Sequence, residues 1–118
     1  MVTLQRNFDS DICYHVYNCG VEKRTIFFNP HDYKRFLDIM TYYLYSPTVS
    51  YSQFLDLDSE IKRGCLDSIR KKKRVQILCY TLMPNHFHLL LKQEVNQGII
   101  QFLDDISNSY TRYINLKR

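Results

Sequence analysis

Two apolar segments joined by only two residues constrain the fold of this chain most strongly. They are Val75–Met83 and His86–Gln93, with Pro84-Asn85 between them. Pro and Asn interrupt regular structure, and the flanking segments are rich in residues that favour strands. Because so short a connection joins neighbouring strands that run in opposite directions, the sequence predicts an antiparallel hairpin. The nearly continuous apolar run of the first segment also predicts a strand buried on both faces, or nearly so.

The rest of the secondary structure follows from periodicity and end signals. A strand is expected over residues 12–18, before the turn signal Asn18-Cys19-Gly20. Asn29 and Pro30 predict the start of an amphipathic helix over residues 30–45, and a second such helix is expected from Ile99 to the end. Residues 46–74 are interpreted as an insertion with short helices near 50–55 and 58–72.

These elements give the order β-α-(insert)-β-β-α in a single domain spanning residues 1–118. That order predicts an α+β, ferredoxin-like (split βαβ) fold, an antiparallel sheet with helices on one face. No strong candidate for a fourth strand follows, so the domain is expected to be truncated at its C-terminal end.

Composition narrows the function classes only loosely. The chain has 118 residues, 45% of them apolar, and a net charge of +4, which is compatible with a nucleic-acid partner but does not require one. No segment is apolar enough for a signal peptide or a membrane span, so a cytoplasmic protein is expected. The four cysteines have no zinc-finger spacing and are expected to be reduced thiols, some of them buried: Cys13, Cys19, Cys65 and Cys79.

The sharpest chemical signal is His86-Phe87-His88. In a strand the two histidines project from one face, about 6.5–7 Å apart along the chain, while Phe87 anchors the other face. Two imidazoles placed in this way can chelate one divalent metal, although the spacing does not select the metal and two ligands do not complete a site. The alternative is a pair of surface histidines without a function. His15, expected on the neighbouring strand, either supports the site or packs.

A second signal is the basic run at residues 70–74, Arg-Lys-Lys-Lys-Arg. One interpretation is a solvated helix end, because cations favour the C-terminal turn of a helix. The other is a surface that contacts nucleic-acid phosphates. The candidate DNA-binding residues are Lys71, Lys72, Lys73 and Arg74, together with Lys23 and Arg24 on the loop after the first strand.

Several motifs together resemble a known family. They are residues 14–20 (Tyr-His-Val-Tyr-Asn-Cys-Gly), 26–28 (Ile-Phe-Phe), 32–37 (Asp-Tyr-Lys-Arg-Phe-Leu) and 79–90, which contain Met-Pro-Asn-His-Phe-His-Leu-Leu. This set resembles the tyrosine HUH single-strand DNA transposases, most closely the branch associated with repetitive extragenic palindromes. Residues 110–115 are similar to the Tyr/Phe-Asn helix end of that branch.

The resemblance implies a ferredoxin-like catalytic domain, usually a homodimer, that nicks and rejoins single-stranded DNA at sites marked by hairpins. It implies that His86 and His88 hold Mg²⁺ or Mn²⁺, which polarises the scissile phosphate. A tyrosine hydroxyl then attacks, forming a 5′-phosphotyrosine and leaving a free 3′-OH. Because the imidazoles must be neutral, activity is expected to fall below about pH 6.

The chain departs from the family pattern at its C-terminal end. The resemblance implies that the nucleophilic tyrosine and the third metal ligand lie on a further helix, beyond residue 118. Tyr110 and Tyr113 are interpreted as packing residues of an amphipathic helix. Cys19 stands where this branch commonly has Arg.

Two alternatives therefore stand beside the transposase interpretation. One is a non-catalytic DNA-hairpin-binding domain on the same fold. The other is an RNA-binding module of the RRM kind, which needs aromatic side chains exposed on the sheet. No RNP-like Gly-Phe/Tyr-Gly-Phe pattern occurs to support it; its candidate aromatics are Tyr14, Tyr17, Tyr80 and Phe87.

Overall fold

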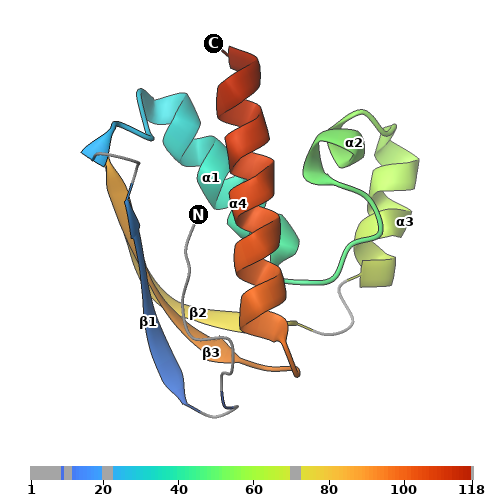
Figure 1. The fold of residues 1–118 in the computed structure, drawn as a ribbon. Helices are drawn as coiled ribbons and strands as arrows, with labels where there is room; N and C mark the ends of the chain where they lie inside the picture. Colours follow the sequence, from blue (N-terminus) through green and yellow to red (C-terminus); the bar gives the residue numbers. More distant parts are fainter. Residues whose placement is uncertain (1–8, 10–11, 20–22, 70–72, 118) are drawn as a thin grey trace.

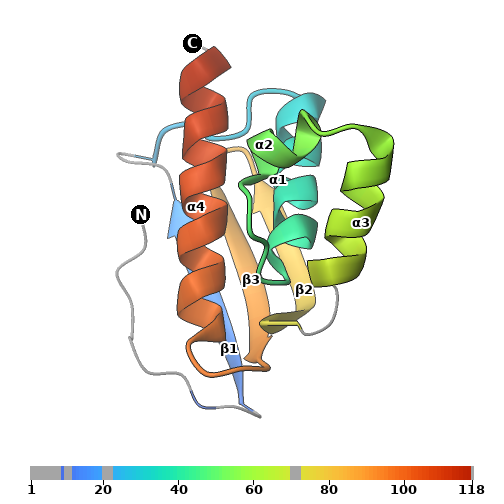
Figure 2. The same ribbon diagram turned by 90° about the vertical axis from the view of Figure 1, so that its right-hand side faces the viewer.

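The computed structural model describes residues 9, 12–19, 23–69 and 73–117, and within them it contains one antiparallel sheet of three strands and four helices. All four helices lie on the same side of the sheet (Figures 1 and 2). The predicted α+β, split βαβ-like fold and its element order are therefore confirmed. The elements are β1 (Cys13–Cys19), α1 (Pro30–Tyr43), α2 (Tyr51–Leu55), α3 (Ser59–Ile69), β2 (Val75–Met83), β3 (His86–Gln93) and α4 (Gly98–Lys117).

Strand β3 is the centre of the sheet, between β1 and β2. Its side chains alternate, so that Phe87, Leu89 and Leu91 are buried toward the helices and the residues between them face the opposite side. Phe87 contacts Phe36 of α1, with ring centroids 5.0 Å apart. The apolar side chains of α4, such as Phe102, complete this core. The core therefore fixes which face of β3 carries the histidines.

The expectation that β2 is buried on both faces is wrong. Strand β2 lies at the edge of the sheet, where Leu78 and Tyr80 are 43% and 50% exposed. Its pairing with β3 shifts between Ile77 and Cys79, which marks a β-bulge at Leu78. The bulge reverses the alternation. The continuous apolar run is thus two alternating patterns joined out of phase: Val75 and Ile77 pair opposite the core-facing residues of β3 before the bulge, and Tyr80 and Leu82 do so after it.

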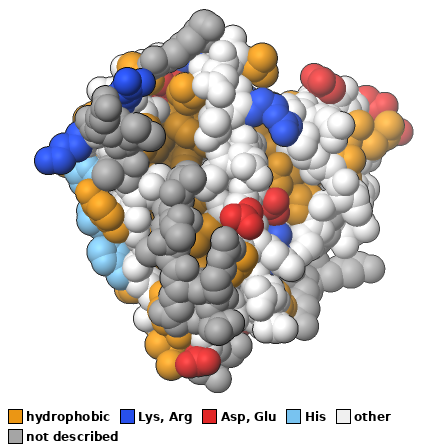
Figure 3. All heavy atoms as spheres, viewed as in Figure 1, with side chains coloured by type: hydrophobic (Ala, Val, Ile, Leu, Met, Phe, Trp, Pro, Cys, Tyr) orange, Lys and Arg blue, Asp and Glu red, His pale blue; other side chains and the backbone are white. Residues whose placement is uncertain are grey.

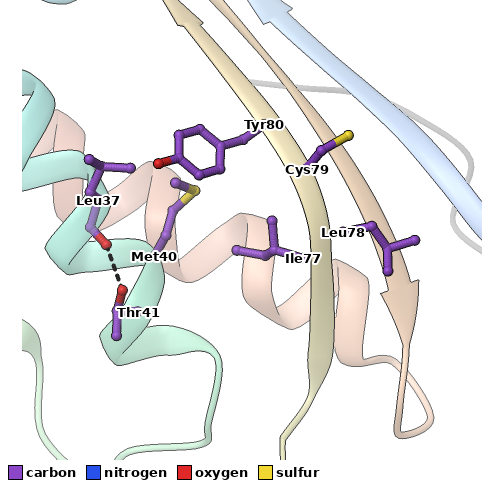
Figure 4. A pocket seen from close by; sticks show the side chains of 7 residues that line it. All are labelled: Leu37, Met40, Thr41, Ile77, Leu78, Cys79 and Tyr80. Atoms are coloured by element: carbon purple, nitrogen blue, oxygen red, sulfur yellow. Dashed lines mark hydrogen bonds between the residues drawn. The ribbon is translucent and has the colours of Figure 1, made fainter.

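The exposed edge leaves a groove of about 500 Å³ between α1 and β2. Leu37, Met40 and Thr41 line it from the helix (Figure 4), and the side chains of Ile77 and Tyr80 point toward them from the strand. The groove lies away from the histidines of β3.

Helix α1 begins where the sequence predicts. The side chain of Asn29 accepts a hydrogen bond from the backbone N–H of Asp32 at 3.0 Å, and Pro30 occupies the first helical position. Asp32 is fully buried, and its carboxylate accepts from the backbone N–H of Phe28, the hydroxyl of Tyr113 and the ammonium of Lys117. Burial acts to raise the pKa of Asp32, but these hydrogen bonds outweigh it and lower the pKa. The buried carboxylate therefore joins the start of α1 to the end of α4.

Helix α4 begins at a glycine that approaches the backbone of the segment before β2. A Cβ atom at Gly98 would lie 2.3 Å from the carbonyl oxygen of Arg74. We therefore expect Gly98→Ala to lower the free energy of unfolding by about 2 kcal/mol, because a backbone carbonyl must move to admit the methyl group. Chemical denaturation of the purified chain measures this change.

Gly64→Ala is the matched control, because among the described residues nothing outside the adjoining backbone of α3 lies within 4 Å of a Cβ at that position. There the substitution is expected to raise the free energy of unfolding by about 0.5–1 kcal/mol, the ordinary helix preference of alanine over glycine. Equal effects at the two glycines would contradict the close approach at Gly98.

Cys13, Cys65 and Cys79 are free thiols; Cys13 and Cys79 are exposed and Cys65 is half-buried, so none of these three is one of the buried thiols that the sequence predicts. The side chain of Cys19 lies outside the described part of the structure. Within residues 9–117, as far as they are described, no helix combines the length and the apolar character that a membrane crossing requires.

Candidate metal centre and nucleic-acid interface

The histidines of β3 lie on the face of the sheet that the helices leave open. Tyr17 of β1 pairs opposite His88, and Cys19 pairs opposite His86. His15 lies on the same face, one row further along β1. As predicted from strand alternation, His86 and His88 share a face while Phe87 is buried on the other. Figure 3 shows histidine side chains at the left edge of the molecule, with Lys and Arg side chains beside them.

His86 is oriented by its neighbour in the turn. Its Nδ1 lies 2.7 Å from Oδ1 of Asn85. Because an amide oxygen can only accept, Nδ1 of His86 carries the proton and donates it. The Nε2 atom of the neutral ring then holds a lone pair. Asn85 therefore helps to set the tautomer in which His86 can bind a metal through Nε2.

His88 contacts His15 on the neighbouring strand. Nε2 of His15 and Nδ1 of His88 are 2.8 Å apart, the planes of the two rings differ by 8°, and the ring centroids are 4.9 Å apart. A centroid separation this much longer than the N···N distance means that the parallel rings meet edge to edge. One imidazole donates and the other accepts in this hydrogen bond.

Burial and the two neighbouring imidazoles together favour the neutral form of His88. Partial desolvation, followed by the proximity of His15 and then of His86, lowers the pKa of His88. A lowered pKa leaves the ring neutral at pH 7 and keeps it neutral further into the acid range than a free histidine. Neutral imidazole is the form that binds metal.

The donor set suits a divalent metal with open coordination positions. The imidazoles of His86 and His88 lie 5.2 Å apart between centroids. Within the described part of the chain, Nε2 of neither ring has a hydrogen-bond partner, and no group of three His, Cys, Asp or Glu side chains is arranged to hold a metal. Two neutral imidazoles could therefore hold such an ion together with water or phosphate oxygens, as in catalytic rather than structural sites.

The tyrosines divide between the two sides of the sheet. The hydroxyl of Tyr110 donates to the carbonyl of Ile26 at 2.6 Å, and that of Tyr113 donates to Asp32 at 2.9 Å. Both residues pack on the helix side, in agreement with their interpretation as packing residues. Tyr17, by contrast, is 47% exposed on the open face, and its ring centroid lies 4.8 Å from that of His88.

Strand alternation puts Tyr17 on the same face as His15, but the sequence alone does not connect it with the histidines of β3. The missing information was the register of β1 against β3, because these strands are far apart in the sequence: His15 and His88 are 73 residues apart. The four aromatic residues named for an RRM-like surface do not share one open face: Phe87 is buried and Tyr14 pairs opposite core-facing Leu91, while Tyr17 faces the open side.

The predicted cations fall into two groups at opposite ends of the hairpin. Exposed Lys23 and Arg24 follow β1, whose end pairs with His86. The backbone N–H groups of Ile26 and Phe27 donate to the carbonyl of Pro84 at 2.7 and 3.0 Å. These bonds join the loop that carries the two cations to the turn that precedes the histidines of β3.

The other group precedes β2, and Lys71 and Lys72 lie outside the described residues. The stretch of β2 from Thr81, which pairs with His88, to Val75 is about 20 Å long. Lys73 is exposed at this distant end. Arg74 differs from the expectation of a phosphate contact, because it is only 4% exposed; it forms an ion pair with Asp105 at 2.9 Å and donates to the carbonyl of Tyr43 at 2.7 Å.

Comparison with known proteins identifies one family. The family described as "Transposase IS200 like" matches residues 9–118 of the chain. No curated protein and no solved structure matches the chain. The match spans nearly the whole sequence, including both strands of the hairpin and the histidine pair. The chain therefore belongs to the IS200-like transposases, a family whose members bind DNA and act in its transposition.

Proposed function

We propose that this chain acts in metal-dependent nicking and rejoining of single-stranded DNA at hairpin-marked sites, and that it does so as a homodimer. The observation that carries the proposal is the pair His86 and His88 on the open face of the sheet. Nδ1 of each ring is hydrogen-bonded, and Nε2 of neither ring has a hydrogen-bond partner among the described residues. Within the family we infer the branch associated with repetitive extragenic palindromes, from the motifs around residues 14–20 and 83–90.

Mg²⁺ or Mn²⁺ held by Nε2 of His86 and His88 would supply Lewis-acid polarisation of the scissile phosphate. The protein's own residues supply the rest of the binding site. Lys23 and Arg24 lie on the loop whose Ile26 and Phe27 bond to Pro84, just before the histidines, and are suited to bind phosphates next to the scissile one. The exposed ring of Tyr17 offers a base a flat surface beside the histidines.

The covalent step requires a tyrosine hydroxyl. Its oxygen forms a bond to phosphorus, the bond from phosphorus to the 3′ oxygen breaks, and the hydroxyl proton passes through solvent or a base to the leaving 3′ oxygen. Tyr110 and Tyr113 are poor candidates, because their hydroxyls are bonded to Ile26 and Asp32 on the helix side. We infer that the nucleophile lies beyond residue 118. Tyr17→Phe tests this inference, because the ring of Tyr17 lies beside that of His88.

The test is a cleavage assay on labelled single-stranded hairpin DNA with Mn²⁺ or Mg²⁺. A denaturing gel reports covalent protein–DNA adduct and free 3′ product. The expected result with this chain alone is metal-dependent binding of the hairpin without an adduct, and formation of an adduct by a longer chain that supplies the tyrosine. Binding that is indifferent both to divalent metal and to the His88→Ala substitution would overturn the metal-dependent function.

The same assay distinguishes the non-catalytic DNA-hairpin-binding domain from the proposed catalytic function. That alternative gains support from the absence of a third ligand among the described residues and from the engaged hydroxyls of Tyr110 and Tyr113. An adduct abolished by Tyr17→Phe would instead assign the nucleophile to this chain. If no extended chain forms an adduct while hairpin binding persists, the protein is a DNA-hairpin binder on a transposase fold.

A further inference from the structure

We propose that His15 is a positioning residue for the metal site: its Nε2 accepts a hydrogen bond from Nδ1–H of His88 and so leaves the lone pair of Nε2 of His88 available to bind the metal. The inference rests on the proposed function, because it assumes that His88 is a metal ligand. It assigns a distinct role to a third histidine that does not itself bind the ion.

The geometry of the contact supports this role. The two rings are nearly parallel and meet edge to edge, with a nitrogen of each 2.8 Å apart. A single proton can occupy this contact when both rings are neutral. If it sits on Nδ1 of His88, Nε2 of that ring carries a lone pair. If it sits on Nε2 of His15, the proton of His88 must occupy its Nε2, and metal binding at that atom is blocked.

In both proposed ligand histidines, the Nδ1 proton is then donated to an acceptor on another residue. Asn85 engages Nδ1 of His86 through an amide oxygen, which can only accept. His15 would do the same for His88 through the lone pair of its Nε2. In water a neutral histidine favours the proton on Nε2, and the hydrogen bond at the other nitrogen decides which tautomer the protein holds. A partner at Nδ1 is therefore needed to reverse the intrinsic preference.

His15 is not explained by packing. It lies on the open face and is exposed, whereas the core-facing residues of β1 are its neighbours Tyr14 and Val16. Nor is it suited to bind the same ion, because its Nε2 faces Nδ1 of His88 and not the Nε2 side. Partners of this kind orient a metal-bound imidazole and typically change metal affinity by about 10–100-fold.

Two substitutions separate hydrogen bonding from bulk. His15→Gln retains an oxygen that can accept from Nδ1 of His88, and His15→Phe fills the same space without an acceptor. We expect His15→Phe to weaken Mn²⁺ binding by at least about tenfold and His15→Gln to weaken it much less. Titration of the whole chain with Mn²⁺, at one pH above the imidazole range, measures both; Cys13→Ala, on the same face of β1, is the matched control and should leave the affinity unchanged.

A second readout requires no metal. ¹⁵N NMR of the imidazoles in the metal-free protein distinguishes the two neutral tautomers, and we expect His88 to carry its proton on Nδ1 in the unsubstituted chain and to shift toward Nε2 in His15→Phe. A proton on Nε2 of His88 in the unsubstituted chain would overturn the inference, as would equal Mn²⁺ affinities of His15→Phe and the unsubstituted chain, or equal losses in the Phe and Gln variants.

Different results would contradict the metal-dependent function and the role of His15. If the unsubstituted chain does not bind Mn²⁺, the metal-dependent function fails, and the tautomer of His88 still decides whether His15 holds that ring. If the chain binds Mn²⁺ and His15→Phe binds it equally well, the function stands and the role of His15 is wrong. Thermal unfolding of each variant checks that the fold is retained.

Discussion

His88→Ala is expected to reduce the affinity of the chain for Mn²⁺ by at least about 100-fold, and His86→Ala by a similar factor. The proposed site has two imidazole ligands and no third His, Cys, Asp or Glu side chain grouped with them among the described residues, so either substitution removes one of the two side chains that would hold the metal. The loss should exceed the 10–100-fold typical of changes at groups that only support a ligand. Isothermal titration with Mn²⁺ measures the affinity, and both variants should bind hairpin DNA about as well as the unsubstituted chain does without metal.

The control for this experiment is His31→Ala. His31 is exposed in the first turn of α1, on the helix side of the molecule, and should leave Mn²⁺ affinity unchanged. None of these three substitutions removes a core side chain, so the free energy of unfolding should change by less than about 0.5 kcal/mol. Retained Mn²⁺ affinity in His86→Ala or His88→Ala would show that the histidine pair is not the ligand set.

Arg74→Gln should produce the largest loss of stability among the substitutions of predicted DNA-binding residues. Its guanidinium is almost fully buried and is bound to Asp105 and to the carbonyl of Tyr43. The substitution therefore removes both the ion pair and this hydrogen bond. Removing one member of a buried ion pair costs about 3–5 kcal/mol, but Asp105 is partly exposed to water, so we expect a loss of about 2–3 kcal/mol in the free energy of unfolding. Urea denaturation followed by circular dichroism measures it.

The adjacent cation provides the comparison. Lys73 is exposed, and Lys73→Gln should change the free energy of unfolding by less than about 0.5 kcal/mol. If Lys73 contacts DNA, the same substitution should lower the slope of log affinity against log salt by about one unit. A stable Arg74→Gln variant with reduced salt dependence would instead make Arg74 a phosphate contact, contrary to its position in the structure.

The sequence predicted most of the fold because strong local signals mark its elements. The Pro84-Asn85 connection could join only an antiparallel hairpin, and Asn29 with Pro30 marked the start of α1. The environment of β2 could not be read in the same way. An apolar run looks the same whether both faces are buried or a bulge reverses the alternation, and the register shift at Leu78 depends on pairing with β3.

The candidate site was predictable to the extent that it is local. The common face of His86 and His88 follows from strand alternation alone. The contact of His15 with His88 depends on the register between β1 and β3, which packing of the core sets. The role of Arg74 was hidden for a similar reason: in a run of five cations, nothing local distinguishes the one that pairs with Asp105 on α4.

The alternation of β3 has a thermodynamic consequence. The side chains that would bind a metal and those that fill the core alternate along the same short strand, so the histidines share one face only while Phe87 and Leu89 occupy the other. An ion that binds this arrangement binds the folded chain and not the unfolded one. By mass action, a metal at 100 times its Kd would add about 2.7 kcal/mol to the free energy of unfolding. The melting temperature of the protein would then report metal occupancy directly, without DNA and without catalysis.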